Sequence, residues 1–383
     1  MDPGRVKVLH IISGLGVGGA ERLLLWAAKY HDRDKYPIGV VSMMSGGELA
    51  TEIRDSGVPV VELGQAKGRL TPAGFRNLLS TVASVRPEVI QGHMFHSNLL
   101  TRLTKLFVSK DSRVINTVHI EWEPFRRKIA YALTAPLVDG TVTFSPDAGK
   151  VFTETGPVGR PIRYIPYGIE VGPRAKKDRE GLRTRLGIDL PGPMWITVGR
   201  LSRQKAYPDL IEAFAMIKPV QGGPTLLIVG EGEDKPILEK LIQEKGLLHR
   251  VRLLGVRHDV PDLLAASDAF VLSSHWEGNP LVVLEAMRAS LPIVTTRVGM
   301  VPTMTVDGKT AFVVEPNRPD LLASAMEKLM TLGHQARTMG EAGRERLERY
   351  YDFRSMQKEL ELFYSELIRD HGNAGSEEIV DGV

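Results

Sequence analysis

The sequence predicts an α/β protein made of two doubly wound domains. Short apolar runs with β-strand character alternate with amphipathic stretches along most of the 383 residues, and this alternation is typical of parallel sheets with crossover helices. The alternation breaks once, in a polar segment at 172–193, and then restarts. A chain of this length exceeds the size at which one hydrophobic core usually keeps growing, so two domains are expected.

The first domain is expected at residues 1–171, the linker at 172–193 and the second domain at 194–352. The linker shows no hydrophobic periodicity. It ends with Pro191-Gly192-Pro193, a sequence typical of turns and loops. A final helix is expected at about 353–371, and the glycine- and acid-rich tail at 372–383 is expected to be disordered. The predicted strands are Val6–Ile12, Ile38–Met43, Val58–Glu62, Val89–Gln91, Val114–Val118, Thr141–Ser145, Ile162–Ile165, Met194–Val198, Thr225–Val229, Val251–Leu254, Ala269–Leu272, Ile293–Thr296 and Ala311–Val314.

The composition is that of an ordinary globular enzyme, with 43% hydrophobic and 25% charged residues. The chain has no cysteine, which excludes disulfides and thiolate metal sites and fits a reducing cytoplasm. No signal peptide is visible, and no apolar run approaches the roughly 20 residues that cross a bilayer. A net charge of +3 does not indicate a nucleic-acid partner. We therefore expect a cytoplasmic protein.

A glycine-rich turn follows the first predicted strand. Gly14, Gly16 and Gly19 match the dinucleotide fingerprint G-x-G-x-x-G between a strand and a helix. The second half of that fingerprint is an acidic residue at the end of the next strand, and it is missing, which disfavours NAD. Glycines still let the backbone approach a ligand, and the helix start offers free N–H groups. A plain tight turn is the alternative interpretation.

Two segments of the second half follow strands and carry chemistry that suits a sugar nucleotide. Arg200 and Lys205 come after one strand, where guanidinium and ammonium groups can hold a diphosphate. Another strand leads into a glycine loop with Pro280 expected as the first residue of a helix, whose free N–H groups would form an anion site. Glu277 beside that site makes sense if it accepts hydrogen bonds from sugar hydroxyls, and Glu285 stands in an apolar stretch where an unpaired carboxylate would be costly.

These residues resemble a known family. Glu277 and Glu285 are separated by seven residues, as in the E-x₇-E signature of retaining nucleotide-sugar glycosyltransferases of family 4. Gly199-Arg200-Leu201 with Lys205 is similar to that family's phosphate loop. Ile165-Pro166-Tyr167-Gly168 resembles its interdomain segment, with Tyr167 where asparagine is commoner. The resemblance runs from Val6 to about Phe363 and extends to transferases of bacterial surface-polysaccharide assembly.

The resemblance implies a GT-B fold, with two Rossmann-like domains facing across a cleft and a final helix that crosses back to the first domain. It implies that Arg200 and Lys205 hold the donor diphosphate, Glu277 the donor sugar and Glu285 the ribose. Together with His119, which would place an imidazole against the donor sugar, Arg200, Lys205 and Glu277 are the expected catalytic residues. The further donor-binding residues that we expect are Gly16, Gly18, Gly19, Glu231, Gly278, Asn279, Pro280 and Leu281.

Three histidines follow predicted strands of the first half. His93 and His96 match a segment that lines the acceptor side in the family, and His119 follows the next strand. A metal held by this trio is disfavoured because no carboxylate stands at companion spacing. Asp32-Arg33-Asp34 spells a D-x-D motif, but it precedes Tyr36-Pro37 instead of ending a strand, so a turn is expected. We expect neither a metal nor a cofactor.

The expected function is a retaining, metal-independent glycosyl transfer from a nucleotide diphosphate sugar, with UDP favoured over GDP, to a hydroxyl acceptor. The acceptor would be a lipid-linked or polysaccharide precursor sugar. The basic and apolar run Pro124–Leu133 suggests peripheral contact with an anionic membrane, and a solvated surface helix is the alternative. A sugar-nucleotide epimerase of related fold and a non-catalytic sugar-nucleotide-binding protein remain open as alternatives.

Overall fold

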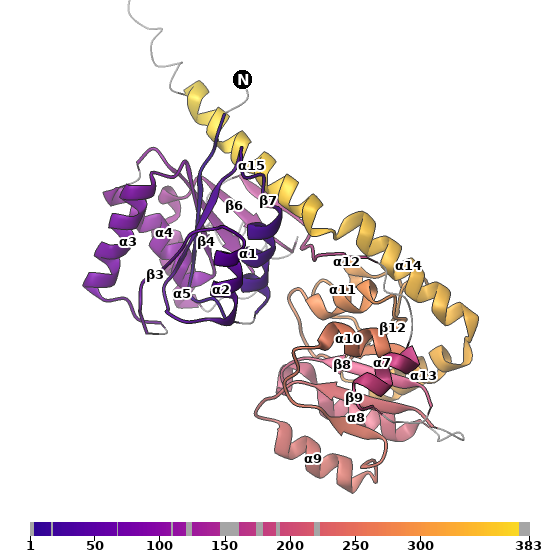
Figure 1. Ribbon diagram of the computed structural model, residues 1–383. Helices are drawn as coiled ribbons and strands as arrows, with labels where there is room; N and C mark the ends of the chain where they lie inside the picture. Colours follow the sequence, from indigo (N-terminus) through magenta and orange to yellow (C-terminus); the bar gives the residue numbers. More distant parts are fainter. Residues whose placement is uncertain are drawn as a thin grey trace, which may run out of the picture. The chain divides into compact units, whose positions relative to one another are not determined.

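The computed structural model describes residues 4–16, 18–66, 68–108, 110–119, 125–145, 161–173, 179–188, 192–217 and 223–374. The chain divides into two compact units: unit 1 is Met1–Glu170 with Phe353–Val383, and unit 2 is Val171–Asp352. Each unit has its own parallel sheet, with strand order β3-β2-β1-β4-β5-β6-β7 in unit 1 and β10-β9-β8-β11-β12-β13 in unit 2 (Figure 1). These are the two doubly wound domains that the alternation of strands and helices predicts.

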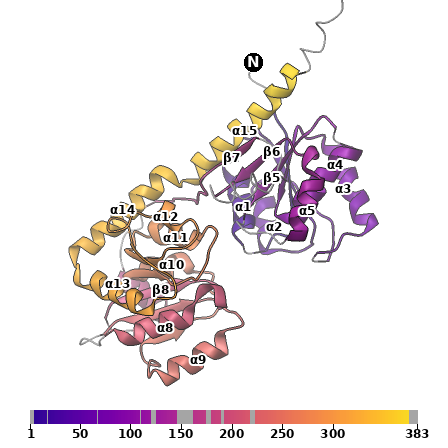
Figure 2. The ribbon, with the colours of Figure 1, turned by 180° about the vertical axis from the view of Figure 1, so that it is seen from behind.

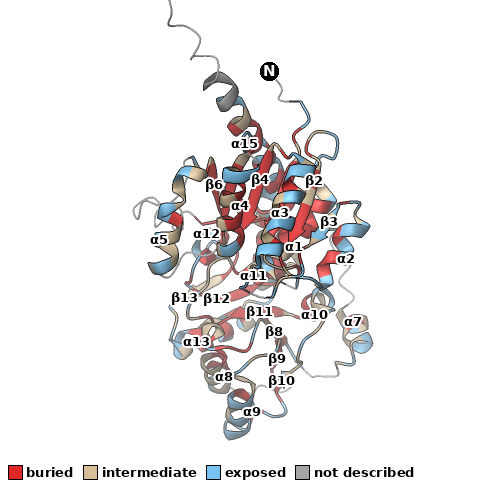
Figure 3. Cartoon of the chain, turned by 90° about the vertical axis from the view of Figure 1, so that its left-hand side faces the viewer, coloured by how far each residue is buried: buried red, intermediate tan, exposed pale blue. Residues whose placement is uncertain are grey.

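Unit 1 places helices on both faces of its sheet. Helices α3 and α4 cover one face, and α1 lies with α15 on the other (Figures 1 and 2). The strands are buried, as Figure 3 shows for β2, β4 and β6, which is why their sequences are nearly continuous apolar runs. The elements are β1 Val8–Ile12, α1 Gly19–Tyr30, β2 Ile38–Ser42, α2 Glu48–Asp55, β3 Val60–Glu62, α3 Pro72–Val85, β4 Val89–His93, α4 Phe95–Phe107, β5 Arg113–Val118, α5 Phe125–Leu133, β6 Gly140–Thr143, β7 Ile162–Tyr164 and α15 Phe353–Ala374.

The C-terminal helix α15 packs on the sheet of unit 1. A Cβ atom on Gly140 would lie 2.8 Å from the ring of Phe363, so glycine on β6 is what lets the helix approach the strand. At the start of the helix, the Phe353 N–H donates to the carbonyl of Ile169 over 2.9 Å. Farther along, the hydroxyls of Tyr36 and Ser365 are hydrogen-bonded at 2.6 Å. Residues 375–383 of the tail that we expected to be disordered lie outside the described residues.

Unit 2 is built in the same way. Helices α8, α9 and α13 contribute Phe214, Leu238 and Met326 to one core that packs against β8 and β9, and α10, α11 and α14 form a second connected group. The elements are α7 Arg179–Arg185, β8 Met194–Val198, α8 Tyr207–Met216, β9 Thr225–Val229, α9 Lys235–Glu244, β10 Val251–Leu253, α10 Val260–Ala266, β11 Ala269–Leu272, α11 Leu281–Arg288, β12 Ile293–Thr296, α12 Val301–Met304, β13 Phe312–Val314, α13 Pro319–Thr331 and α14 His334–Tyr350.

The expected linker, 172–193, includes α7, whose Arg179 and Arg183 form ion pairs with Asp268 at 3.0 and 2.6 Å. One local expectation needs correction. Pro280 is the N-cap of α11, and the helix begins at Leu281. Each predicted strand is present, with ends that agree to within two residues.

Candidate functional site

The strand order of unit 2 reverses between β8 and β11, which are neighbours in the sheet although three strands apart in the chain. In open parallel sheets, ligands bind beyond the carboxyl ends of the strands at such a reversal. The loop after β8 carries Arg200 and Lys205, and the loop after β11 carries Glu277. The topology therefore brings the sequence-predicted residues of unit 2 to one edge of one sheet.

Glu277 is the centre of a compact polar cluster. One of its carboxylate oxygens accepts from Lys205 Nζ and from Ser274 Oγ, each at 2.6 Å, and the other accepts from Gln204 Nε2 at 3.3 Å. The side chains of Lys205 and Glu277 are only 16% and 7% exposed. A carboxylate this deeply buried needs such partners, because an unpaired buried charge is strongly destabilising.

The backbones of the two loops are also joined. The His275 N–H donates to the carbonyl of Gln204 over 2.9 Å, and Ser273 Oγ donates to the carbonyl of Lys205 over 2.8 Å. These bonds hold the Lys205 loop against the Glu277 loop independently of the ion pair. Arg200, at the start of the Lys205 loop, is exposed.

The loop after β9 packs against the loop after β8. Gly230 has a φ of +138°, and a Cβ atom on it would lie 2.0 Å from the carbonyl oxygen of Gly199. A Cβ atom on Gly232 would lie 2.1 Å from the carbonyl oxygen of Leu201. Both glycines are needed for close packing of two backbones. Glu231, which we expected to bind the donor, is exposed and pairs with Lys235 one helical turn on, at 2.9 Å.

Helix α11 carries the second glutamate of the E-x₇-E pair. Glu285 is only 9% exposed, on a helix whose other buried residues include Val283, Leu284 and Met287. The turn before α11 is hydrogen-bonded to a later segment of the chain, because the Met300 N–H donates to the carbonyl of Gly278 over 2.9 Å. The expected donor-binding turn Gly278–Leu281 is thus anchored to the start of α12.

In unit 1, three histidines lie in a row at the centre of the sheet. His10 Nδ1 and His93 Nε2 are hydrogen-bonded at 3.0 Å, and the rings of His93 and His119 lie 5.8 Å apart. Burial lowers the pKa of His10 to about 3 and that of His119 to about 4, and it also lowers the pKa of His93 well below its usual value. All three imidazoles are therefore neutral at pH 7.

His93 and His96, which we expected on the acceptor side, lie in different environments. His93 is fully buried between His10 and His119, so its side chain has no surface with which to touch an acceptor. His96 is exposed near the start of α4, with its ring 5.2 Å from that of Phe95. His10 was missed by the sequence analysis, because a histidine inside a strand looks like any other core position.

The glycine loop of unit 1 leads into α1, whose first turn is contacted by Glu21 and Tyr167. Gly18 is the N-cap of α1, and a Cβ atom on it would lie 2.3 Å from a carboxylate oxygen of Glu21. The hydroxyl of Tyr167 donates to the carbonyl of Gly19, and the Tyr167 ring packs at 4.7 Å from Phe144. Tyr167, which departs from the family's asparagine, therefore anchors the first turn of the helix after the loop.

Asp32 confirms the interpretation of D-x-D as a turn, because its Oδ1 accepts from the backbone N–H groups of Asp34 and Lys35 at 3.1 and 3.0 Å. In the described parts of the chain, no three His, Asp or Glu side chains are grouped as a metal site would require. Among the same residues, no helix is long and apolar enough to cross a membrane.

Comparison with known proteins identifies both halves of the chain. The family model "Glycosyltransferase Family 4" matches residues 17–172, and "Glycosyl transferases group 1" matches 178–346. An N-acetyl-alpha-D-glucosaminyl L-malate synthase of Bacillus anthracis is 30% identical over 198 residues, 52% of each chain. A putative teichuronic acid biosynthesis glycosyltransferase, TuaC, of Bacillus subtilis is 35% identical over 43% of this chain and 40% of its own. The chain thus matches about half, or less, of the length of these curated relatives.

Among solved structures, Anabaena HepE in complex with UDP-glucose superimposes with a TM-score of 0.79 at 22% identity, over 94% of this chain and 100% of that one. This likeness shows the fold. With the two family models matching both units in chain order, the chain belongs to glycosyltransferase family 4, with the GT-B architecture of two Rossmann-like domains.

Proposed function

We propose that this protein transfers a sugar from a nucleotide diphosphate sugar to an acceptor hydroxyl, with retention of the anomeric configuration and without a metal. The donor is a UDP-sugar in preference to a GDP-sugar. The acceptor is a sugar of a lipid-linked or polysaccharide precursor. Neither a metal nor another cofactor takes part.

The cluster of Glu277, Lys205 and Ser274, at the same edge of the sheet as the loop with the exposed Arg200, carries this proposal. A diphosphate requires cations at the reversal point of the sheet, and a sugar ring offers hydroxyl donors that a carboxylate can accept. Both kinds of group meet here within hydrogen-bonding distance. A site that only bound nucleotides would have no use for a buried carboxylate next to its phosphate-binding lysine.

Charge determines how these residues would act. As the anomeric bond breaks, negative charge grows on the leaving diphosphate and positive charge grows on the sugar ring. Arg200 and Lys205 stabilise the first, and Glu277 stabilises the second, because such preorganised groups act most strongly where charge develops. Retention then follows if the acceptor hydroxyl attacks on the face that the diphosphate leaves and passes its proton to a leaving phosphate oxygen.

Two observations support the finer choices of donor and acceptor. HepE, which shares this fold, is in complex with UDP-glucose in its solved structure, and TuaC is named for teichuronic acid biosynthesis. Helix α5 adds a surface for a lipid-linked acceptor: Arg126 is exposed on it, and so are Ile129 and Leu133, the latter 78% exposed. Apolar side chains beside cations suit the surface of an anionic membrane, where a cytoplasmic enzyme would meet such an acceptor.

The test is turnover of UDP-, GDP- and ADP-sugars with alkyl glycosides as acceptors, with and without EDTA. We expect release of UDP from a UDP-sugar, resistance to EDTA, and a product whose anomeric proton coupling by NMR matches the donor. Conversion of the donor alone to another sugar nucleotide would identify an epimerase. Binding without turnover would leave a non-catalytic sugar-nucleotide-binding protein, and an inverted product would refute the retaining mechanism.

A further inference from the structure

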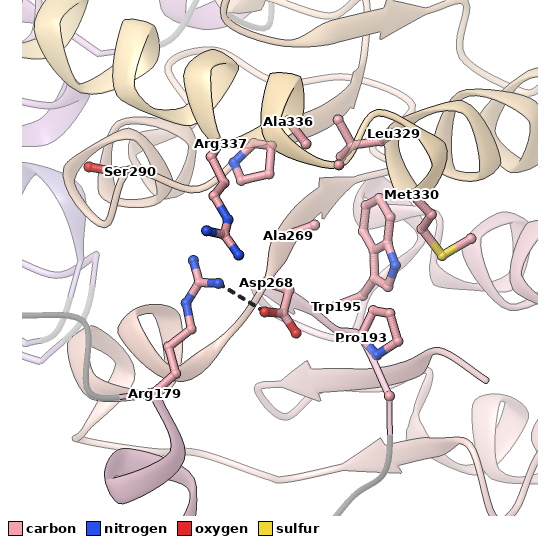
Figure 4. A pocket seen from close by; sticks show the side chains of 13 residues that line it. Arg179, Pro193, Trp195, Asp268, Ala269, Ser290, Leu329, Met330, Ala336 and Arg337 are labelled. Carbon is pink, nitrogen blue, oxygen red and sulfur yellow. Dashed lines mark hydrogen bonds and ion pairs between the residues drawn. The ribbon is translucent and has the colours of Figure 1, made fainter. Parts of the chain in front are cut away.

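Unit 2 contains a cavity at the opposite edge of its sheet from Arg200 and Glu277. It lies at the amino ends of β8 and β11 and has a volume of about 310 Å³ (Figure 4). One wall is apolar and includes Trp195, Pro292 and Leu329. Since β8 has five residues, its length of about 15 Å separates this cavity from the Arg200 loop. An occupant would not compete with a ligand bound at the Glu277 cluster.

The other wall of the cavity is cationic. Figure 4 shows the guanidinium groups of Arg179, on α7, and Arg337, on α14, pointing toward one another. The nearby acid, Asp268, already accepts from Arg179 at 3.0 Å, from Arg183 at 2.6 Å and from the Met194 N–H at 2.8 Å. Arg337 forms no ion pair with any residue that the structure describes. Among the described residues that line the cavity, one carboxylate, Asp268, stands with two arginines, Arg179 and Arg337, and it also pairs with Arg183, which leaves an excess of positive charge.

The pKa of Arg179 agrees with this excess of positive charge. Its pKa is lowered, chiefly by burial, and the charges of Arg183 and Arg337 lower it further against the opposing effect of Asp268. A bound anion would relieve that repulsion. One buried donor of the cationic wall, Arg179 Nε, has no hydrogen-bond partner in the described part of the chain. Buried donors without acceptors are uncommon in folded proteins and mark places where a partner is missing.

We propose that this cavity binds a small amphipathic organic anion, with a phosphate or carboxylate group between Arg179 and Arg337 and an aromatic or aliphatic portion against Trp195. The apolar wall distinguishes such a ligand from inorganic phosphate, and the two arginines distinguish it from a neutral hydrophobic molecule. The inference does not depend on the proposed glycosyl transfer, because none of the lining residues belongs to the Glu277 cluster.

Trp195 provides a local readout. With indole nitrogens labelled with ¹⁵N, the four tryptophans give four indole N–H signals, and Trp195→Phe identifies the one in the cavity. Phenyl phosphate is the probe, since it combines a dianion with an aromatic ring. We expect a saturable shift of the Trp195 signal, with much smaller shifts at the same concentrations of inorganic phosphate or benzyl alcohol.

Arg337→Gln is the decisive variant because the side chain is exposed and its loss should not disturb folding. Removing one charged hydrogen bond should raise the Kd for phenyl phosphate about tenfold. Arg252→Gln, on the exposed side of β10, is the matched control and should leave the Kd unchanged. The exposed Trp276, next to Glu277, reports binding at the other site in the same spectrum.

The proposal is overturned by an unmoved Trp195 signal, by an Arg337→Gln variant that binds as tightly as the parent, or by benzyl alcohol acting as well as phenyl phosphate. The last result would show an apolar cavity without anion selectivity. A shift confined to Trp276 would place phenyl phosphate at the Glu277 cluster and would equally refute a second anion site.

Discussion

Replacing Glu277 by glutamine should tighten the binding of a nucleoside diphosphate while it lowers turnover. In the structure, the carboxylate of Glu277 neutralises Lys205 at 2.6 Å. A diphosphate that also uses Lys205 would bring its own negative charge close to that carboxylate. Glutamine has the same size, and its one carbonyl oxygen can still accept from Ser274; its amide nitrogen loses only the longer bond from Gln204, at 3.3 Å. The change therefore removes a charge with little change in packing.

The expected change in the Kd for UDP follows from the distances in this cluster. A phosphate oxygen bound to Lys205 Nζ at about 2.8 Å lies at most about 5.4 Å from the Glu277 oxygen. Two unit charges at that separation repel by about 3 kcal/mol at an effective dielectric constant of 20 and by about 0.8 kcal/mol in water. Lys205 is partly exposed, so an intermediate value of about 1.4 kcal/mol is reasonable, which corresponds to a tenfold lower Kd for UDP.

Calorimetric titration of UDP into the parent protein and into Glu277→Gln measures this difference. Glu244→Gln is the matched control, because Glu244 also pairs with a lysine, Lys240, at 3.6 Å on the exposed face of α9. It should leave the Kd for UDP unchanged. Raising the salt concentration should reduce the gain, since the repulsion is screened.

Unchanged or weaker binding of UDP by Glu277→Gln would refute the reasoning. It would mean either that the diphosphate does not use Lys205 or that Glu277 itself contacts the nucleotide. A control titration with Arg200→Ala separates these outcomes, because Arg200 is expected to bind the diphosphate without contacting Glu277.

Three further predictions follow from the same contacts. Arg200→Ala should lower kcat/KM for the donor at least tenfold in steady-state assays, because it removes a charge-assisted hydrogen bond worth about 1.5–3 kcal/mol; wild-type kinetics would contradict its role. Since burial lowers the pKa values of His10 and His119 to about 3 and about 4, the unfolded chain binds more protons below pH 6.5, and stability is lost as the pH falls from about 6.5 toward 4. The Tm should fall between pH 7.5 and 5.5, and less so in His119→Asn; equal slopes would count against this assignment. Gly230→Ala should destabilise unit 2 by at least about 2 kcal/mol in urea unfolding, because its Cβ would meet the Gly199 carbonyl. Gly246→Ala, which has open space around it, should cost clearly less.

The sequence by itself determined the fold class and the positions of the strands. Strands of a parallel sheet are buried on both faces, so runs such as Met194–Val198 are apolar throughout and can be recognised locally. It also indicated which loops carry chemistry, because Arg200, Lys205 and Glu277 each follow a strand, and the carboxyl ends of parallel strands meet at one edge. Gly230 and Gly232, in the loop after β9, can be read from the sequence as well. The close packing of this loop against the loop after β8, which requires both glycines, cannot.

Only the tertiary structure decided how these residues are paired. Lys205 and Glu277 are 72 residues apart. The sequence predicts a separate role for each, and they form an ion pair because β8 and β11 are neighbours in the sheet. The same holds for His10 and His93, which are hydrogen-bonded across 83 residues, and for the removal of His93 from the surface. Strand order depends on contacts between distant segments, and a local pattern of residues carries no record of it. The cavity at Trp195 likewise exists only because α7, α13 and α14 converge on the amino ends of β8 and β11.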